Sequence, residues 1–196
     1  MFGYIRNERF LVFDLEMTGL SPRADSIIEV GAVPLLGTKP DGELFFSPMQ
    51  PYTKVSSSSK RIHGLGGENL WNAPPAEVVM THLFNMMNGR ILVGQKPELD
   101  LTFLWSAAKN VGGNMPTDWA IDISKLFANV FPDQNSFSLE AMARRIGIKI
   151  NRKKHNAMQD AIITAKIFSK IIPKLGKKGI SLTRELIPIA KTTMQR

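Results

Sequence analysis

Two carboxylates stand at the end of an apolar segment near the start of the chain. Residues 10–13 read FLVF, and Asp14 and Glu16 follow within DLEMTGL. If this segment is a strand, both acids point to the same side, because alternate strand residues share a face. Neighbouring negative charges repel each other unless a cation lies between them. The pair therefore predicts a bound cation.

Two further acids lie near the starts of predicted helices. Asp100 follows the apolar segment 91–94, and Asp160 flanks the apolar face of the helix expected over 157–172. Asp100 alone would also suit a helix N-terminus as a favourable negative charge. Mg²⁺ and Mn²⁺ prefer oxygen ligands, and two such ions can activate a water and stabilise the leaving oxygen of a phosphodiester. Four acids in a chain without cysteine therefore predict two divalent ions, Mg²⁺ or Mn²⁺, and argue against structural zinc.

His155 stands five positions before Asp160. On one helix that spacing would turn the two side chains about 140° apart, so a shared site requires His155 to lie on the loop before the helix. There it could act as a general base, since histidine titrates near neutral pH. A histidine that follows Arg152, Lys153 and Lys154 is otherwise typical of a solvent-exposed surface.

The apolar pattern predicts the elements that position these residues. Strands are expected at 10–15, 27–33, 44–46, 91–94 and 120–123, and helices at 76–87, 99–108, 138–147 and 157–172. An antiparallel meander followed by alternating helices and strands indicates an α/β fold, with a mixed five-stranded sheet flanked by helices. We expect one domain over residues 1–173, because Pro173 should end the last helix. Residues 174–196 would then form a basic C-terminal tail that packs back or docks a partner.

Composition and charge restrict the class of protein. The 196 residues suffice for one well-cored domain, and no apolar run approaches the roughly 18 residues that span a bilayer. The N-terminus lacks a signal-like apolar segment, so we expect a cytoplasmic protein without a membrane partner. Residues 141–184 carry twelve lysines or arginines and a single acid. This basic block indicates either a solvated face or a polyanionic partner, for which nucleic acid is the better interpretation.

Three motifs in order resemble those of the DEDDh 3′→5′ exonucleases, which have a ribonuclease H-like fold. The motifs are DLEMTGL, VGQKPELDLTFL and HNAMQD, and the resemblance covers about residues 9–172. Between them, RIHGL, AIDISKLFANVFP and SFSLEAMARRIGI are similar to the epsilon proofreading subunit of bacterial replicative polymerases and its stand-alone relatives. The resemblance implies a metal-dependent exonuclease that hydrolyses single-stranded or frayed DNA from the 3′ end and releases nucleoside 5′-monophosphates.

The resemblance also assigns roles to individual residues. Four acids would bind the metal ions and His155 would be the general base; the acids are Asp14, Glu16, Asp100 and Asp160. His63 would lie near the terminal nucleotide, with Thr18 and Leu20 lining its pocket. The second motif departs from the family, which usually has Gly-His-Asn and then an aromatic residue before the Asp. This chain has Gln95, Lys96, Pro97 and Leu99 there, and Lys96 could pair with a phosphate as a point charge.

Other interpretations remain. DLEMTGL is typical of oligoribonucleases, so an exonuclease acting on short RNA is the alternative. A non-catalytic nucleic-acid-binding protein would lack one of the five key residues, and all five are present. A polymerase-associated subunit would need a docking segment, for which only the residues after Pro173 are available. The expected partner is thus nucleic acid, single-stranded DNA before RNA, with a DNA polymerase subunit as a further candidate.

Overall fold

The computed structural model of this chain describes residues 3–65, 70–151 and 155–194. One mixed sheet has the strand order β3-β2-β1-β5-β6-β7, and β4 also pairs with β2. β1 is antiparallel to β2 and parallel to β5, which is parallel to β6. The strands are β1 (Arg9–Met17), β2 (Ile27–Leu36), β3 (Lys39–Pro40), β4 (Phe45–Pro48), β5 (Ile91–Gly94), β6 (Trp119–Asp122) and β7 (Lys191–Thr193).

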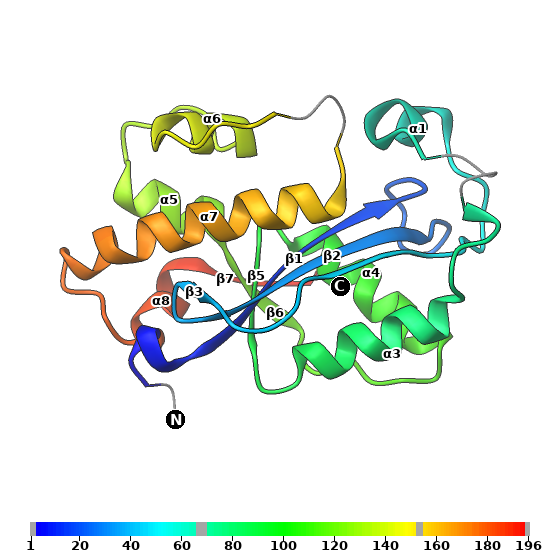
Figure 1. Ribbon diagram of the computed structural model, residues 1–196, viewed down its shortest axis with the longest axis horizontal. Helices are drawn as coiled ribbons and strands as arrows, with labels where there is room; N and C mark the ends of the chain where they lie inside the picture. The colour runs from blue at the N-terminus through cyan, green and yellow to red at the C-terminus, as the bar shows by residue number, and fades with distance from the viewer. Residues whose placement is uncertain (1–2, 66–69, 152–154, 195–196) are drawn as a thin grey trace.

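Helices cover both faces of this sheet (Figure 1). α7 lies across β1 and β2 and packs with α5, α6 and α8 in one apolar cluster, whereas α3 and α4 pack with the opposite face. The described helices are η1 (Ile5–Asn7), α1 (Ser57–His63), α3 (Ala76–Met87), α4 (Glu98–Asn110), α5 (Ile123–Val130), α6 (Leu139–Arg145), α7 (Ala157–Gly176) and α8 (Thr183–Ala190). Within the described residues, no helix combines the length and the hydropathy that crossing a bilayer requires.

β1 is apolar on both sides because it is a central strand. Phe10 and Val12 pack into the cluster that contains α7, and Leu11, Phe13 and Leu15 pack into the cluster that contains α3 and α4. The alternation explains why the segment reads as continuously apolar rather than as an alternating strand. It also means that even-numbered positions of β1 face α7.

The predicted α/β class and mixed sheet are confirmed, and each of the five expected strands is present. The sheet differs from the prediction in having seven strands, because the short β3 and β7 extend its edges. α5 was not predicted. It begins directly after β6, where the Asp122 carboxylate accepts a hydrogen bond of 2.7 Å from the Ser124 N–H and caps the helix.

The predicted helix end at Pro173 is wrong, since α7 continues to Gly176. Proline lacks an N–H and so removes one backbone hydrogen bond of the helix. Here the buried side chains of Ile172 and Leu175 hold the last turn on the core. Residues 183–193 then form α8 and β7, and β7 pairs with β6. The expected division of the chain at Pro173 therefore falls inside a helix.

Candidate active site

Asp14 and Glu16 lie on the face of β1 that α7 covers. Their cross-strand partners on β2 are Gly31 and Glu29, and directly opposed residues of neighbouring strands point to the same face. A methyl group at Gly31 would overlap the backbone of Ala157 at the start of α7. The two carboxylates of β1 therefore lie toward the N-terminal end of α7, as a shared metal site requires.

Asn156 caps the N-terminal end of α7. Asn156 is extended, and its side-chain oxygen accepts a hydrogen bond of 3.1 Å from the Gln159 N–H. Asp160 then lies in the first turn, where the helix dipole favours a negative charge. Its side chain is buried against the sheet.

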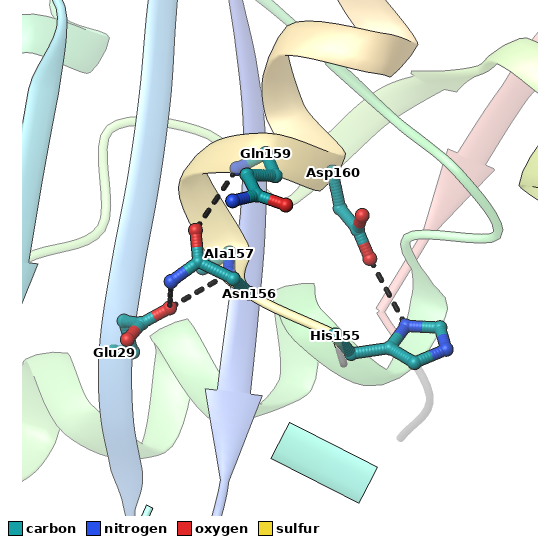
Figure 2. Close-up of polar contacts among 6 residues, drawn as sticks. All are labelled: Glu29, His155, Asn156, Ala157, Gln159 and Asp160. Carbon is teal, nitrogen blue, oxygen red and sulfur yellow. Dashed lines mark hydrogen bonds and ion pairs between the residues drawn. The ribbon is translucent and has the colours of Figure 1, made fainter. Parts of the chain in front are cut away.

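His155 lies before α7, as predicted, and its ring turns back toward the helix (Figure 2). The His155 Nδ1 atom is 3.0 Å from Asp160 Oδ2. The imidazole is about half exposed, whereas the Asp160 carboxylate is buried. The contact orients the ring so that Nδ1 faces the carboxylate and leaves Nε2 as the nitrogen available to a substrate or water.

Three of the five predicted catalytic residues form one group. Ligand atoms of Glu16, His155 and Asp160 all lie within 4.8 Å of one another, drawn from β1 and the start of α7. Two buried carboxylates at this separation repel unless a cation neutralises them. Their hard oxygen atoms suit Mg²⁺ or Mn²⁺. Asp14 is half-buried two residues before Glu16, on the same face of β1. The donor set therefore fits the predicted metal ions.

Asp100 lies outside that group of three, in the first turn of α4. β5 runs parallel to β1, so the segment after β5 leaves the sheet at the same edge as Asp14 and Glu16. Burial raises the pKa of Asp100 from 3.8 to about 7, and the negative charge of Glu98 adds to the shift. A carboxyl group with this pKa binds a proton near neutral pH unless a cation displaces it.

The stability of the metal-free protein should consequently fall as the pH rises from about 4 to about 7. Across this range the folded protein holds a proton on Asp100 that the unfolded chain has released, so higher pH favours unfolding. Denaturant unfolding in EDTA at several pH values measures the effect. Asp100→Asn should flatten the curve; parallel curves for the two proteins would show that Asp100 titrates normally.

The predicted substrate residues have different surroundings. Thr18 is buried, and its hydroxyl donates to Asp25 at 2.9 Å and accepts from the Ser26 N–H. The Thr18 carbonyl accepts from the Ser56 N–H, which ties the loop before α1 to the end of β1. Leu20 is 79% exposed. The backbone of His63 lies in α1, but its side chain falls outside the described residues; Arg152, Lys153 and Lys154 also lie outside them.

Lys96 has an unusual backbone conformation, with φ of 51°. Its side chain is exposed, and its N–H donates to the buried Asp122 carboxylate at 3.1 Å. Left-handed backbone costs a residue with a side chain about 1–2 kcal/mol. Strained backbone occurs often at ligand-binding sites, and the phosphate contact of Lys96 stays a prediction.

Replacing Lys96 by glycine should separate backbone strain from charge. The variant should keep or gain up to about 1 kcal/mol of unfolding free energy, since glycine relieves the strain but adds freedom to the unfolded chain. If Lys96 pairs with a phosphate, the slope of log K against log salt for single strands should become shallower by about 0.7. Lys96→Ala, which keeps the strain and removes the charge, is the control. An unchanged slope in both variants would assign Lys96 to the solvated surface.

Sequence reasoning missed Glu29. This acid lies in the apolar strand IIEVGAV, is almost fully buried, and accepts hydrogen bonds from Asn156 and Ala157 at the start of α7. Desolvation raises the pKa of Glu29; the Ala157 hydrogen bond opposes the shift and the Asp160 charge adds to it. A single acid within an apolar strand was the available signal, and it has the same form as the signal that identified Asp14 and Glu16.

The chain is similar to proteins of known class over most of its length. A model of the exonuclease family, RNase_T, matches residues 11–168. The chain is 32% identical over 179 residues to DNA polymerase III PolC-type of Caldanaerobacter subterraneus subsp. tengcongensis, covering 90% of this chain and 12% of that protein. It is 31% identical over 175 residues to the DNA polymerase III subunit epsilon-like protein of Rhodobacter capsulatus, covering 88% and 25%. It thus corresponds to a minor part of each relative.

Solved structures share the fold. Escherichia coli Exonuclease I in complex with a dT13 oligonucleotide superposes with a TM-score of 0.76 at 14% identity, covering 88% of this chain and 43% of that one. The nuclease domain of 3′hExo, a DEDDh family member bound to rAMP, gives 0.72 at 19% identity, covering 85% and 92%.

The sheet and its helical layers have the ribonuclease H-like fold, as predicted. The chain belongs to the exonuclease family, as its three motifs predicted.

Proposed function

We propose that this protein is a metal-dependent 3′→5′ exonuclease that removes nucleoside 5′-monophosphates from single-stranded or frayed DNA. The observation that carries the proposal is the group of Glu16, His155 and Asp160 at the edge where β1 ends. Asp14 and Asp100 would complete the ligand set for two Mg²⁺ or Mn²⁺ ions. When bound, these ions would supply Lewis-acid stabilisation of the charge that develops on the phosphodiester.

Side chains of the protein would transfer the proton and bind the substrate strand. His155, with Nδ1 on Asp160, would take a proton at Nε2 from the water that attacks the terminal phosphorus. The bond between that phosphorus and the 3′ oxygen of the preceding nucleotide would break. The released 3′ oxygen then gains a proton, and the terminal nucleotide leaves with a 5′-phosphate. Thr18, Leu20 and His63 would contact this nucleotide, and Lys96 a phosphate of the strand.

Strands labelled at either end test the direction of hydrolysis. A 3′ label should appear at once as a mononucleotide, whereas a 5′-labelled strand should shorten stepwise. Glu16→Gln should be inactive, and Asp41→Asn, which alters a surface acid paired with Arg9, should be as active as the wild-type protein. Release of the 5′ label first would contradict the proposal. The same assay with RNA strands tests the alternative of an oligoribonuclease-like enzyme, and addition of a DNA polymerase tests whether the protein works beside one.

Mismatched 3′ ends should be cleaved faster than paired ones. A terminal nucleotide must leave its duplex to enter the site, and unpairing costs a few kcal/mol, least at a mismatch. Initial rates on duplexes that differ only in the last base pair measure the preference. Equal rates would indicate that the protein does not separate the strands before hydrolysis.

A further inference from the structure

A buried acid on β2, Glu29, is hydrogen-bonded to the N-cap and the first residue of α7 (Figure 2). Glu29 Oε1 accepts two hydrogen bonds of 2.7 Å, one from Asn156 Nδ2 and one from the Ala157 N–H. The Ala157 N–H is one of the donors that the first turn of a helix leaves without an intrahelical partner. Glu29 thus satisfies a helix end by a side chain from a strand 127 residues away.

Asn156 uses both ends of its amide. Its Nδ2 donates to Glu29, while its Oδ1 accepts from the Gln159 N–H at 3.1 Å. The amide therefore joins the strand to the helical cap in one orientation, because neither atom can exchange roles with the other. Two positions further along the same face of β2, Gly31 permits close approach, since a methyl group there would meet the backbone of Ala157 and Met158.

Asn156 and Ala157, which bond to Glu29, lie between His155 and Asp160 in the chain. His155 immediately precedes Asn156, and Asp160 follows Ala157 within the same turn. Glu29 is also the cross-strand partner of Glu16, the third member of the group. A shift of the start of α7 on β2 would therefore move His155 and Asp160 together relative to Glu16.

We propose that Glu29, acting through Asn156 and Ala157, is a positioning residue that holds His155 and Asp160 in catalytic register with Glu16. This inference rests on the proposed exonuclease function. Glu29 bonds to Asn156 and Ala157, so it would act by fixing the positions of His155 and Asp160. A misplacement of about 1 Å at a catalytic group can cost roughly 10²-fold in rate.

Exchange of the carboxylate and the amide between positions 29 and 156 tests the contact. Asn156→Asp places a carboxylate against Glu29 and should lower kcat about 10²-fold, with KM changed less than threefold. The double variant Glu29→Gln with Asn156→Asp restores an amide–carboxylate pair with reversed polarity. The amide nitrogen of the new Gln would donate to the new Asp, and its amide oxygen would still accept from the Ala157 N–H. The new Asp can still accept from the Gln159 N–H. Its kcat should return to within tenfold of the wild-type value. Ser169→Ala, which removes the 2.9 Å hydrogen bond from α7 to the Thr38 carbonyl at the far end of the helix, should leave kcat unchanged.

A second measurement separates this inference from the proposed function. The chain has three histidines, so His155→Ala assigns the ring signals of His155 in NMR spectra of the metal-free protein. These signals should shift in Asn156→Asp and return in the double variant, with thermal unfolding showing that each variant is folded. Wild-type protein without exonuclease activity would overturn the proposed function, while the NMR result still decides the contact. An active wild type with unchanged kcat in Asn156→Asp, or no recovery in the double variant, would overturn the inference.

Discussion

Asp160→Asn is expected to lower the rate of 3′-end hydrolysis by about 10³-fold or more, and EDTA should abolish it. Asp160 is buried within 4.8 Å of Glu16 and His155. Under the proposed function the variant would lose a carboxylate charge that binds metal, and it would also lose the contact that orients the imidazole. Loss of a single electrostatic contribution to the transition state commonly costs about 10²–10³-fold, and Asp160 would make two under the proposed function.

Binding of Mn²⁺ without substrate provides an independent measure. Calorimetry should show weaker binding in Asp160→Asn, and saturating Mn²⁺ should raise the melting temperature of the wild-type protein, because a ligand that binds only the folded state stabilises it. Asp133→Asn is the matched control, since Asp133 is an exposed acid paired with Arg145. Full activity in EDTA, or wild-type activity in Asp160→Asn, would exclude the proposed metal site.

His155→Ala should lower kcat by about 10²–10⁴-fold, the usual contribution of a positioned general base. Binding of Mn²⁺ should weaken far less, since the buried oxygen atoms of Glu16 and Asp160 remain. The half-exposed imidazole can be removed without opening a cavity in the core. The variant should therefore unfold at nearly the wild-type temperature.

The control for this variant is a histidine remote from the group. His82 stacks on Phe45 with ring centroids 4.4 Å apart, and it belongs to α3, which packs with the opposite face of the sheet. His82→Ala should retain kcat. Single-turnover kinetics with saturating enzyme measures both variants at the chemical step, and an unaltered rate in His155→Ala would assign this residue to the solvated surface.

The elements that the sequence predicted best depend on local signals. The helix over 76–87 and the strand over 91–94 have the predicted bounds, because a regular apolar period and flanking turn residues define both. Ser138, the first residue of the helix expected over 138–147, caps α6 (Leu139–Arg145), and its hydroxyl accepts from the Ala141 N–H. Asp14 and Glu16 were recognised for a similar reason, since charges at the end of an apolar strand conflict with their surroundings.

Other features arise from contacts between distant segments. β7 has only three residues and exists because β6 offers it an open edge, and α7 passes through Pro173 because core contacts outweigh one lost hydrogen bond. Neither the pairing of β7 nor the continuation of α7 past Pro173 can be read from neighbouring residues in the sequence.

The candidate site divides in the same way. Residue types and spacing alone predicted that four carboxylates bind metal ions, and a shared site required His155 to precede the helix. Only the tertiary structure placed His155 against Asp160 and showed that Glu29, from a separate strand, holds the start of α7. A period or a cap involves residues a few positions apart, whereas the relation of β2 to α7 depends on packing across the sheet, which no local pattern records.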